Sequence, residues 1–216
     1  GVQTCALPIY VGAGLPNSKT PADLALTVRD LRFGRDHAMA RWWAGGDPVA
    51  TAWLTALSAS FPRGEAMFIE AVKAFREGTS GQLEAEIRDF IRQEVNHSRE
   101  HVAFNRAAVD AGYDLTAIDA RVAALIVMTH TRPPIVRLAI TTALEHFTAI
   151  FSHEFLAHPE HFHGSDTELA DLWRWHAVEE IEHKGVAFDT FLHATQRWSG
   201  FRRWALRSFV MADVSR

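Results

Sequence analysis

The chain has 216 residues, of which 48% are hydrophobic, and its formal net charge at pH 7 is −4. This size and composition suffice for one sizeable buried core, and nothing in the sequence requires a second. The body of the chain has no clustered basic stripe, so the charge pattern argues against nucleic acid as a partner. No uninterrupted apolar run approaches the roughly 20 residues that span a bilayer, so we expect a soluble protein.

The first nine residues, GVQTCALPI, have neither helical nor strand periodicity and lack the charged start of a signal peptide. They resemble the in-frame translation of a sequencing-library adapter, so residues 1–9 are interpreted as an artefact. Cys5, the only cysteine, lies in this segment, and the rest of the chain therefore has no thiol for a disulfide or a metal. We expect a cytoplasmic protein whose natural ends lie beyond the given sequence.

Residues 10–46 are predicted to form an N-terminal extended segment ahead of one helical domain at 47–216. Within the extended segment, ALTVRDLRF (25–33) shows partial alternation of apolar and polar residues. A lone strand has nothing to pair with, so an extended conformation is expected there instead of a sheet.

The helical pattern begins at Asp47, a residue type suited to the N-cap, followed by Pro48 in the first turn. A helix is predicted to about Ser60. A second helix, or a kinked continuation of the first, is predicted from Pro62 to Gly78.

Three further long helices follow, which with short connections indicate an all-α, ferritin-like four-helix bundle with additional helices. The first of them is about 45 Å long at helical rise. The predicted starts are Ser80, the proline pair at 133–134 and the capping box SDTE at 165–168, and the predicted ends lie before Gly112, near His158 and near Thr195.

Ionisable residues interrupt the inward-facing apolar stripe of four of these predicted helices. In the helix after Ser80, for example, the stripe passes from Phe90 through three ionisable residues, Glu94, His97 and His101, to Phe104. The residues predicted to meet in the core are Glu65, Glu94, His97, Glu145, His176, Glu180 and His183.

Four uncompensated carboxylates in a core would each cost several kcal/mol or take up a proton. Two divalent cations would neutralise them, and mixed imidazole and carboxylate ligation suits iron best here, with manganese or zinc as alternatives. The tetrapeptides EVNH (94–97) and EIEH (180–183), together with Glu65 and Glu145, reproduce the ligand order of ferritin-like dimetal bundles. The seven residues are therefore predicted to be metal ligands.

Other residues around this pattern receive different interpretations. His101 and Asp189 are candidates for an extra ligand or for contacts that orient one, whereas Glu179 and Glu182 flank the stripe and are expected to face solvent or to support a ligand. EHFH at 160–163 also matches Glu-x-x-His, but it lies between proline and glycine and is interpreted as accidental.

Most of the chain, from about Leu26 onward, resembles the bacterial family of predicted metal-dependent hydrolases. The segments that carry the resemblance are GDPVATAWLTALSASFPRGEAMFIEAV, FIRQEVNHSREHVAFN, AGYD and HAVEEIEHKGVAFD. The resemblance implies hydrolysis with a bound metal. The spacing of His176, Glu180 and His183 is also similar to that in dimetal N-oxygenases of aryl amines, a likeness confined to the ligands.

Two functions follow from these observations. The favoured hypothesis is a di-iron enzyme that activates O₂ and oxidises a small organic substrate, because Glu-x-x-His pairs in a bundle are typical of oxygen-handling sites. The alternative is a metal-dependent hydrolase that uses a metal-activated bridging water. A homo-oligomer is compatible with either.

The C-terminal segment RWSGFRRWALRSFVMADVSR mixes aromatic residues with arginines. We expect a final helix that docks its aromatic side chains on the bundle. The alternative is a helix that makes weak contact with a membrane surface.

Overall fold

The computed structural model describes residues 25–34, 37–79 and 81–216, and in these ranges it contains α-helices and one short 3-10 helix but no strand. The prediction of an all-α fold is confirmed. The elements are α1 (Pro48–Lys73), α2 (Gly81–Asp110), α3 (Thr116–His130), α4 (Pro134–Ala157), η1 (Pro159–Phe162), α5 (Thr167–His183), α6 (Val186–Ala194) and α7 (Gly200–Val214).

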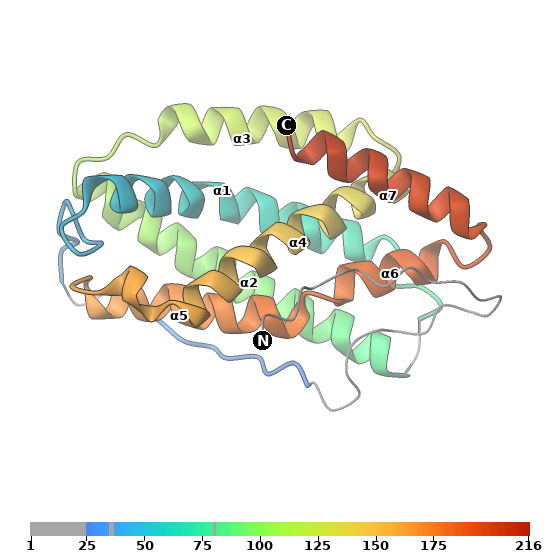
Figure 1. Cartoon of the computed structure of the whole chain (residues 1–216), viewed down its shortest axis with the longest axis horizontal. Helices are drawn as coiled ribbons and strands as arrows, with labels where there is room; N and C mark the ends of the chain where they lie inside the picture. Colours follow the sequence, from blue (N-terminus) through green and yellow to red (C-terminus); the bar gives the residue numbers. More distant parts are fainter. Residues whose placement is uncertain (1–24, 35–36, 80) are drawn as a thin grey trace.

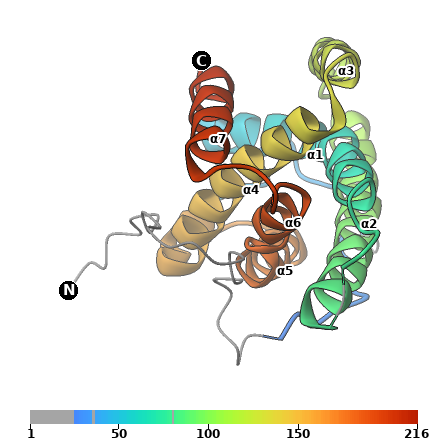
Figure 2. The same cartoon turned by 90° about the vertical axis from the view of Figure 1, so that its right-hand side faces the viewer.

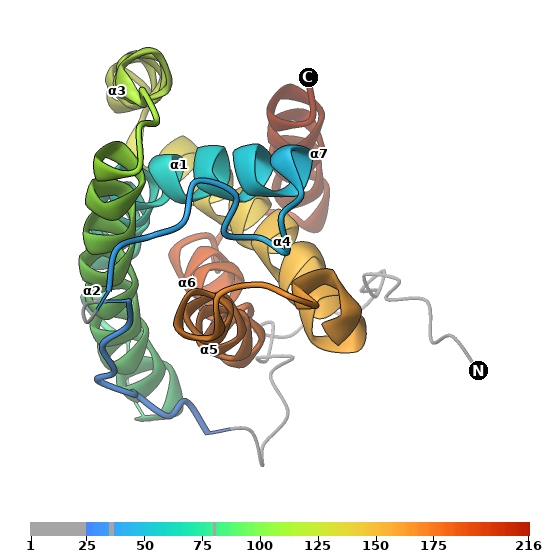
Figure 3. The ribbon, with the colours of Figure 1, turned by 90° about the vertical axis from the view of Figure 1, so that its left-hand side faces the viewer.

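Four helices form a closed ring in which α1 packs on α2, α2 on α5, α5 on α4, and α4 on α1 (Figure 1). Figure 3 shows α2 and α4 on opposite sides of α5. The remaining helices are peripheral: α3 lies against α1, while α6 and α7 lie against α4. The inward stripes of the four ring helices therefore face a shared interior.

The first helix begins and continues as its sequence suggests. The carboxylate of Asp47 accepts hydrogen bonds from the backbone N–H groups of Val49 at 2.7 Å and Ala50 at 3.2 Å. Pro62 lies inside α1 without ending it, so the prediction of a continuation is confirmed and that of a separate second helix is wrong.

Three predicted helix boundaries are wrong, the first being the end of α1, which lies at Lys73 and not at Gly78. The N-cap of α5 is Asp166, whose side chain accepts hydrogen bonds from the N–H groups of Glu168 and Leu169, whereas Ser165 does not cap the helix. The helix predicted to reach Thr195 is two helices, because α5 ends at His183 and α6 begins after Gly185. Glycine is a poor helix former, and this one coincides with the break.

Two apolar clusters enclose the middle of the bundle. One contains Phe90 of α2 and Phe191 of α6, and the other contains Phe104 of α2 and Trp173 of α5. The polar part of the α2 stripe therefore lies between two fully packed regions, where water has little access.

An extended segment, residues 25–33, crosses from α5 to α2, and we call it the N-terminal strap. Its backbone N–H groups at Arg29 and Phe33 donate to Glu179 of α5 at 2.9 Å and to Glu100 of α2 at 3.1 Å. The extended conformation predicted for this segment is confirmed. The interpretation of residues 1–9 and Cys5 falls outside the described residues.

The apolar character of α4 corrects the expectation that no segment is long and apolar enough to span a bilayer. Among the described helices it alone is long and apolar enough to cross a membrane, with a mean hydropathy of 1.2 over 18 residues. However, α4 packs against α1, α5, α6 and α7, and it carries the buried Glu145. A core helix passes the same test of length and composition, so this observation is weak evidence for a membrane span.

The last helix docks on the bundle, but not through its aromatic residues. Val210 is its one buried residue, and Leu206 packs beside it against the core. Phe201, Trp204 and Phe209 are 75%, 59% and 70% exposed. The prediction that these aromatic side chains dock on the bundle is therefore wrong.

Candidate metal centre

All seven predicted ligands come together in the interior of the helical ring, and each is at most 3% exposed. Glu65 comes from α1, Glu94 and His97 from α2, and Glu145 from α4. The other three, His176, Glu180 and His183, come from α5. Each helix delivers its residues because a period of 3.6 places positions three and four apart on one face.

One group of side chains surrounds His183 at the α6 end of α5. The Nε2 atom of His183 lies 3.4 Å from Glu94 Oε1 and 3.5 Å from Glu145 Oε2. These three residues, which we call the His183 cluster, have ligand atoms within 4.8 Å of one another, as a shared metal ion would require.

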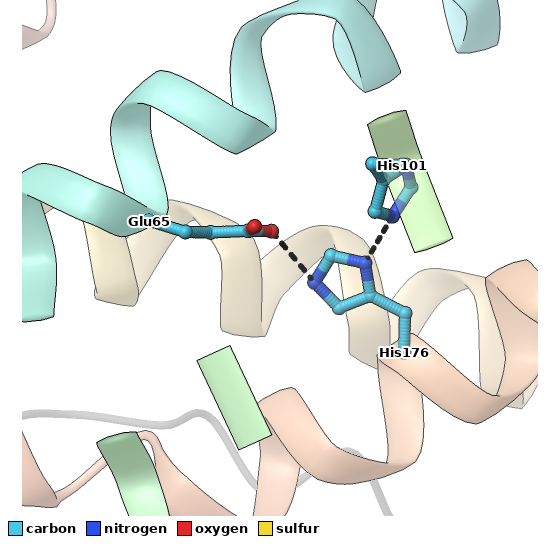
Figure 4. Close-up of side chains that lie close together, drawn as sticks. All are labelled: Glu65, His101 and His176. Atoms are coloured by element: carbon cyan, nitrogen blue, oxygen red, sulfur yellow. Dashed lines mark hydrogen bonds and ion pairs between the residues drawn. The ribbon is translucent and has the colours of Figure 1, made fainter. Parts of the chain in front are cut away.

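A second group, the His176 cluster, comprises Glu65, His97 and His176. His176 Nε2 lies 3.9 Å from Glu65 Oε1, and Figure 4 shows Glu65 and His101 approaching opposite sides of the His176 ring. The rings of His97 and His176 are stacked, with centroids 4.1 Å apart. Any two members of this cluster belong together to a set of three residues whose ligand atoms lie within 4.8 Å of one another. The third residue of each set is His101, Glu180 or Glu94.

Glu180 lies between the two clusters. Its Oε1 atom is 3.3 Å from His183 Nε2, 3.6 Å from His97 Nδ1 and 3.0 Å from His176 Nε2. A carboxylate in this position can contribute a ligand atom to either cluster.

Each imidazole of the site has one nitrogen engaged and one directed at the carboxylates. His97 Nε2 lies 3.0 Å from Glu179 Oε2, and His183 Nδ1 lies 3.1 Å from Gln93 Oε1. His176 Nδ1 lies 2.6 Å from His101 Nε2. Outer hydrogen bonds of this kind fix the ring orientation of metal-ligating histidines.

The buried carboxylates have few partners in the protein itself. Burial, with the charges of nearby carboxylates, raises the pKa values of Glu65 and Glu94 well above their usual range, and burial raises the pKa of Glu145 to about 8. Buried polar atoms normally have hydrogen-bond partners. The side-chain atoms of the site that lack one are Glu65 Oε1, both oxygens of Glu94 and Glu145, Glu180 Oε2, His97 Nδ1 and His183 Nε2.

These orphaned atoms include the oxygens and nitrogens that face one another across the site. A cation would satisfy them together and would stabilise the ionised carboxylates. The residues therefore fit bound divalent metal ions.

His183 and Glu180 compensate part of the charge of the site without a metal ion. Burial alone would lower the pKa of His183, but the charges of Glu180 and Glu145 raise it to about 9. Burial alone would raise the pKa of Glu180, but the charge of His183 and the hydrogen bond with His176 hold it well below its usual range. A metal ion would compete with this proton for His183, so binding should release protons.

His101 is completely buried, next to the His176 cluster. Its Nδ1 lies 2.8 Å from Ser58 Oγ, and burial with the charge of His176 lowers its pKa well below the usual range. His101 also shares a set of potential ligand atoms with Glu65 and His176. The prediction of an orienting contact fits the observed hydrogen bond to His176, and the prediction of an additional ligand stays open.

The structure also gives Glu179 a defined place. It is completely buried, which excludes the predicted solvent-facing position and supports the alternative that it holds a ligand. Its carboxylate bonds His97 on one side and Arg29 of the strap on the other, with the Arg29 Nη1 to Glu179 Oε1 distance at 3.3 Å. Arg29 is absent from the predicted site, and no helical period in the sequence could place an extended segment against α5.

Asp189 and the Glu-x-x-His match EHFH at 160–163 lie outside these clusters. Asp189 is buried on α6. The pKa of Glu86 is raised chiefly by the burial of Glu86 and further by the charge of Asp189. Glu160 is exposed in η1 and lies 3.0 Å from His158 Nδ1. Neither Asp189 nor Glu160 belongs to a potential ligand set found among the described residues.

A narrow cleft between α1, α4 and α5 leads toward His176 and Glu180. Its walls are mostly apolar and include Leu57, Phe61 and Phe151. Its volume of about 20 Å³ holds roughly one water molecule. Any larger molecule therefore requires the aromatic side chains to move.

An all-α protein with converging buried carboxylates and imidazoles defines a candidate metalloprotein. The comparison with known proteins agrees: this chain belongs to the family described as predicted metal-dependent hydrolase, whose model matches residues 27–216. The resemblance predicted from about Leu26 is thereby confirmed. No curated protein and no solved structure matches the chain.

The bond between Glu179 and His97 leads to a prediction about metal affinity. We expect Glu179→Ala to weaken metal binding by about 10- to 100-fold, because the His97 ring loses the acceptor that orients it. Competition with a chromophoric chelator measures this change. Glu168→Ala is the matched control, since Glu168 also bonds the chain next to the strap, at Gly34 N (2.7 Å), and belongs to no potential ligand set found among the described residues. Equal affinities for the two variants would contradict the orienting role.

Proposed function

We propose that this chain is a hydrolase with a dinuclear metal centre. The observation that carries the proposal is the set of orphaned carboxylate and imidazole atoms that four helices direct at one another in a dry interior. Membership of the predicted metal-dependent hydrolase family supports hydrolysis as the type of reaction. When bound, two such ions lower the pKa of a water molecule and supply a nucleophile near neutral pH.

The protein residues have distinct parts in this proposal. Glu94, Glu145 and His183 hold one ion, and Glu65, His97 and His176 hold the other. Glu180 lies between them. The apolar cleft leading to His176 and Glu180 admits the substrate once its aromatic side chains move, and it keeps bulk water out, which strengthens the electrostatic interactions of the site.

Oxidation of a small organic substrate by O₂ at a di-iron centre remains a second candidate. The specific observation in its favour is the third imidazole, since His176 Nε2 lies 3.0 Å from Glu180 Oε1. Together with the two Glu-x-x-His pairs, it gives the bundle a nitrogen-rich ligand set that suits iron. Similarity to ferritin-like proteins and N-oxygenases belongs to this second proposal.

One experiment separates the two candidates. Protein loaded with zinc or manganese is tested on a panel of carboxylic esters, amides and phosphoesters, and protein loaded anaerobically with Fe(II) is tested for O₂ consumption. We expect metal-dependent hydrolysis of at least one substrate class. His176→Ala should retain metal at the His183 cluster but lose most of this activity, since the second ion loses a ligand. O₂ uptake above the buffer control, without hydrolysis of any substrate, would reverse the ranking.

A further inference from the structure

The outer face of α7 is unusual for a helix at the surface of a water-soluble protein. Phe201, Trp204 and Phe209 project from it, each more than half exposed, while Val210 on the opposite side is buried. Figure 2 shows α7 on the outside of α4, at the periphery of the bundle. Large exposed apolar groups gathered on one helix face mark a surface that binds something.

The charge of this segment points to the kind of partner. Residues 196–216 contain five arginines and one aspartate, whereas the whole chain has a net charge of −4. Arg197 and Arg202 are exposed, and the guanidinium of Arg202 lies 3.8 Å from the centre of the Trp198 ring. Cationic groups beside exposed aromatic rings match a surface that is negatively charged outside and apolar beneath.

We propose that α7 binds the surface of a bilayer that contains anionic lipids. Phe201, Trp204 and Phe209 enter the boundary between headgroups and acyl chains, and the exposed Arg197 and Arg202 contact lipid phosphates. Amphipathic helices with aromatic residues on one side and arginine at the flanks bind membranes in this manner, with their axis in the plane of the interface. Each basic residue near such a surface contributes about 1 kcal/mol, an effect that salt weakens.

The opposite face of α7 is already engaged, which fixes the orientation of the bound protein. Leu206 and Met211 pack against the core cluster, and the Arg207 guanidinium lies 4.8 Å from the centre of the Phe188 ring. The helix is therefore held on α4, and its aromatic side is the side available to contact a membrane. Binding requires no unfolding of the bundle and does not depend on the metal centre.

The test is co-sedimentation of the full chain with vesicles of phosphatidylcholine alone or mixed with phosphatidylserine. We expect binding to the mixed vesicles that decreases with added salt, and little binding to phosphatidylcholine alone. Replacing Phe201, Trp204 and Phe209 with serine should remove most of the bound fraction. Arg197→Gln and Arg202→Gln should each weaken binding about fivefold.

A matched control replaces three exposed apolar residues elsewhere, Val49, Val102 and Val109, with serine. This variant should bind vesicles like the wild type, and circular dichroism should show that all variants retain their helix content. Absence of sedimentation with anionic vesicles would overturn the proposal. So would a dimer in analytical ultracentrifugation that the aromatic variant alone converts to a monomer, because a second copy of the chain would then cover α7.

Discussion

Glu180→Ala is expected to eliminate at least one of the two metal ions per chain that we propose for the wild-type protein. The reason is the central position of this carboxylate, whose Oε1 lies within 3.6 Å of His97 Nδ1, His176 Nε2 and His183 Nε2. Its loss removes a ligand from both positions together, so the effect should exceed that of losing a ligand at one end. Elemental analysis of protein purified without chelators measures the content.

The comparison variants make this result interpretable. Glu94→Ala should also lower the metal content, since both of its oxygens are buried without a hydrogen-bond partner. Glu160→Ala should leave the content unchanged, because Glu160 is exposed in η1. An absence of transition metal from the freshly purified wild-type protein would refute the site.

The ligand residues could be predicted because helical periodicity carries three-dimensional information. Once a stripe of apolar residues is interrupted by Glu94 and His97, the interruption must face the interior on the same side as Phe90 and Phe104. The residues that support the ligands carry no such signal. Arg29 reaches Glu179 from an extended strap, and an extended segment has no period that specifies which helix it crosses.

Some elements of the fold could likewise be predicted from the sequence, and others could not. Long helices were predictable from their breakers and caps, whereas α3 was missed because its apolar residues are spread around the helix and form no one-sided stripe. The break at Gly185 was also missed, since a single glycine is tolerated in many helices. For α7, composition alone could not tell docked from exposed aromatic residues, because Leu206 and Val210 fill the buried side instead.

The stability of the metal-free protein should fall as the pH rises from 6.5 to 9. Glu145 has a folded-state pKa of about 8 against an ordinary 4.5, chiefly because of burial. His183 has a folded-state pKa of about 9 against 6.5, because the charges of Glu180 and Glu145 outweigh its burial. In this window the folded state keeps protons that the unfolded chain has released. Each such proton costs about 1.4 kcal/mol of stability per pH unit.

Other groups of the site do not reverse this trend. The raised pKa values of Glu65 and Glu94 act in the same direction as that of Glu145. His97 and His101 have lowered pKa values, so their contribution to stability changes below pH 6.5, where the unfolded chain binds the extra proton. Above that pH they are neutral in both states.

Urea unfolding of chelator-treated protein at pH 6.5 and pH 9 measures the predicted loss, and the same series with saturating zinc provides the contrast. Metal binding requires deprotonated ligands, so the zinc-bound protein should gain stability relative to the metal-free form as the pH rises. Glu145→Gln should make the metal-free protein less sensitive to pH between 6.5 and 8, because the amide has no proton to lose. If metal-free wild-type protein instead became more stable toward pH 9, the buried carboxylates would already be ionised and compensated by groups other than a metal.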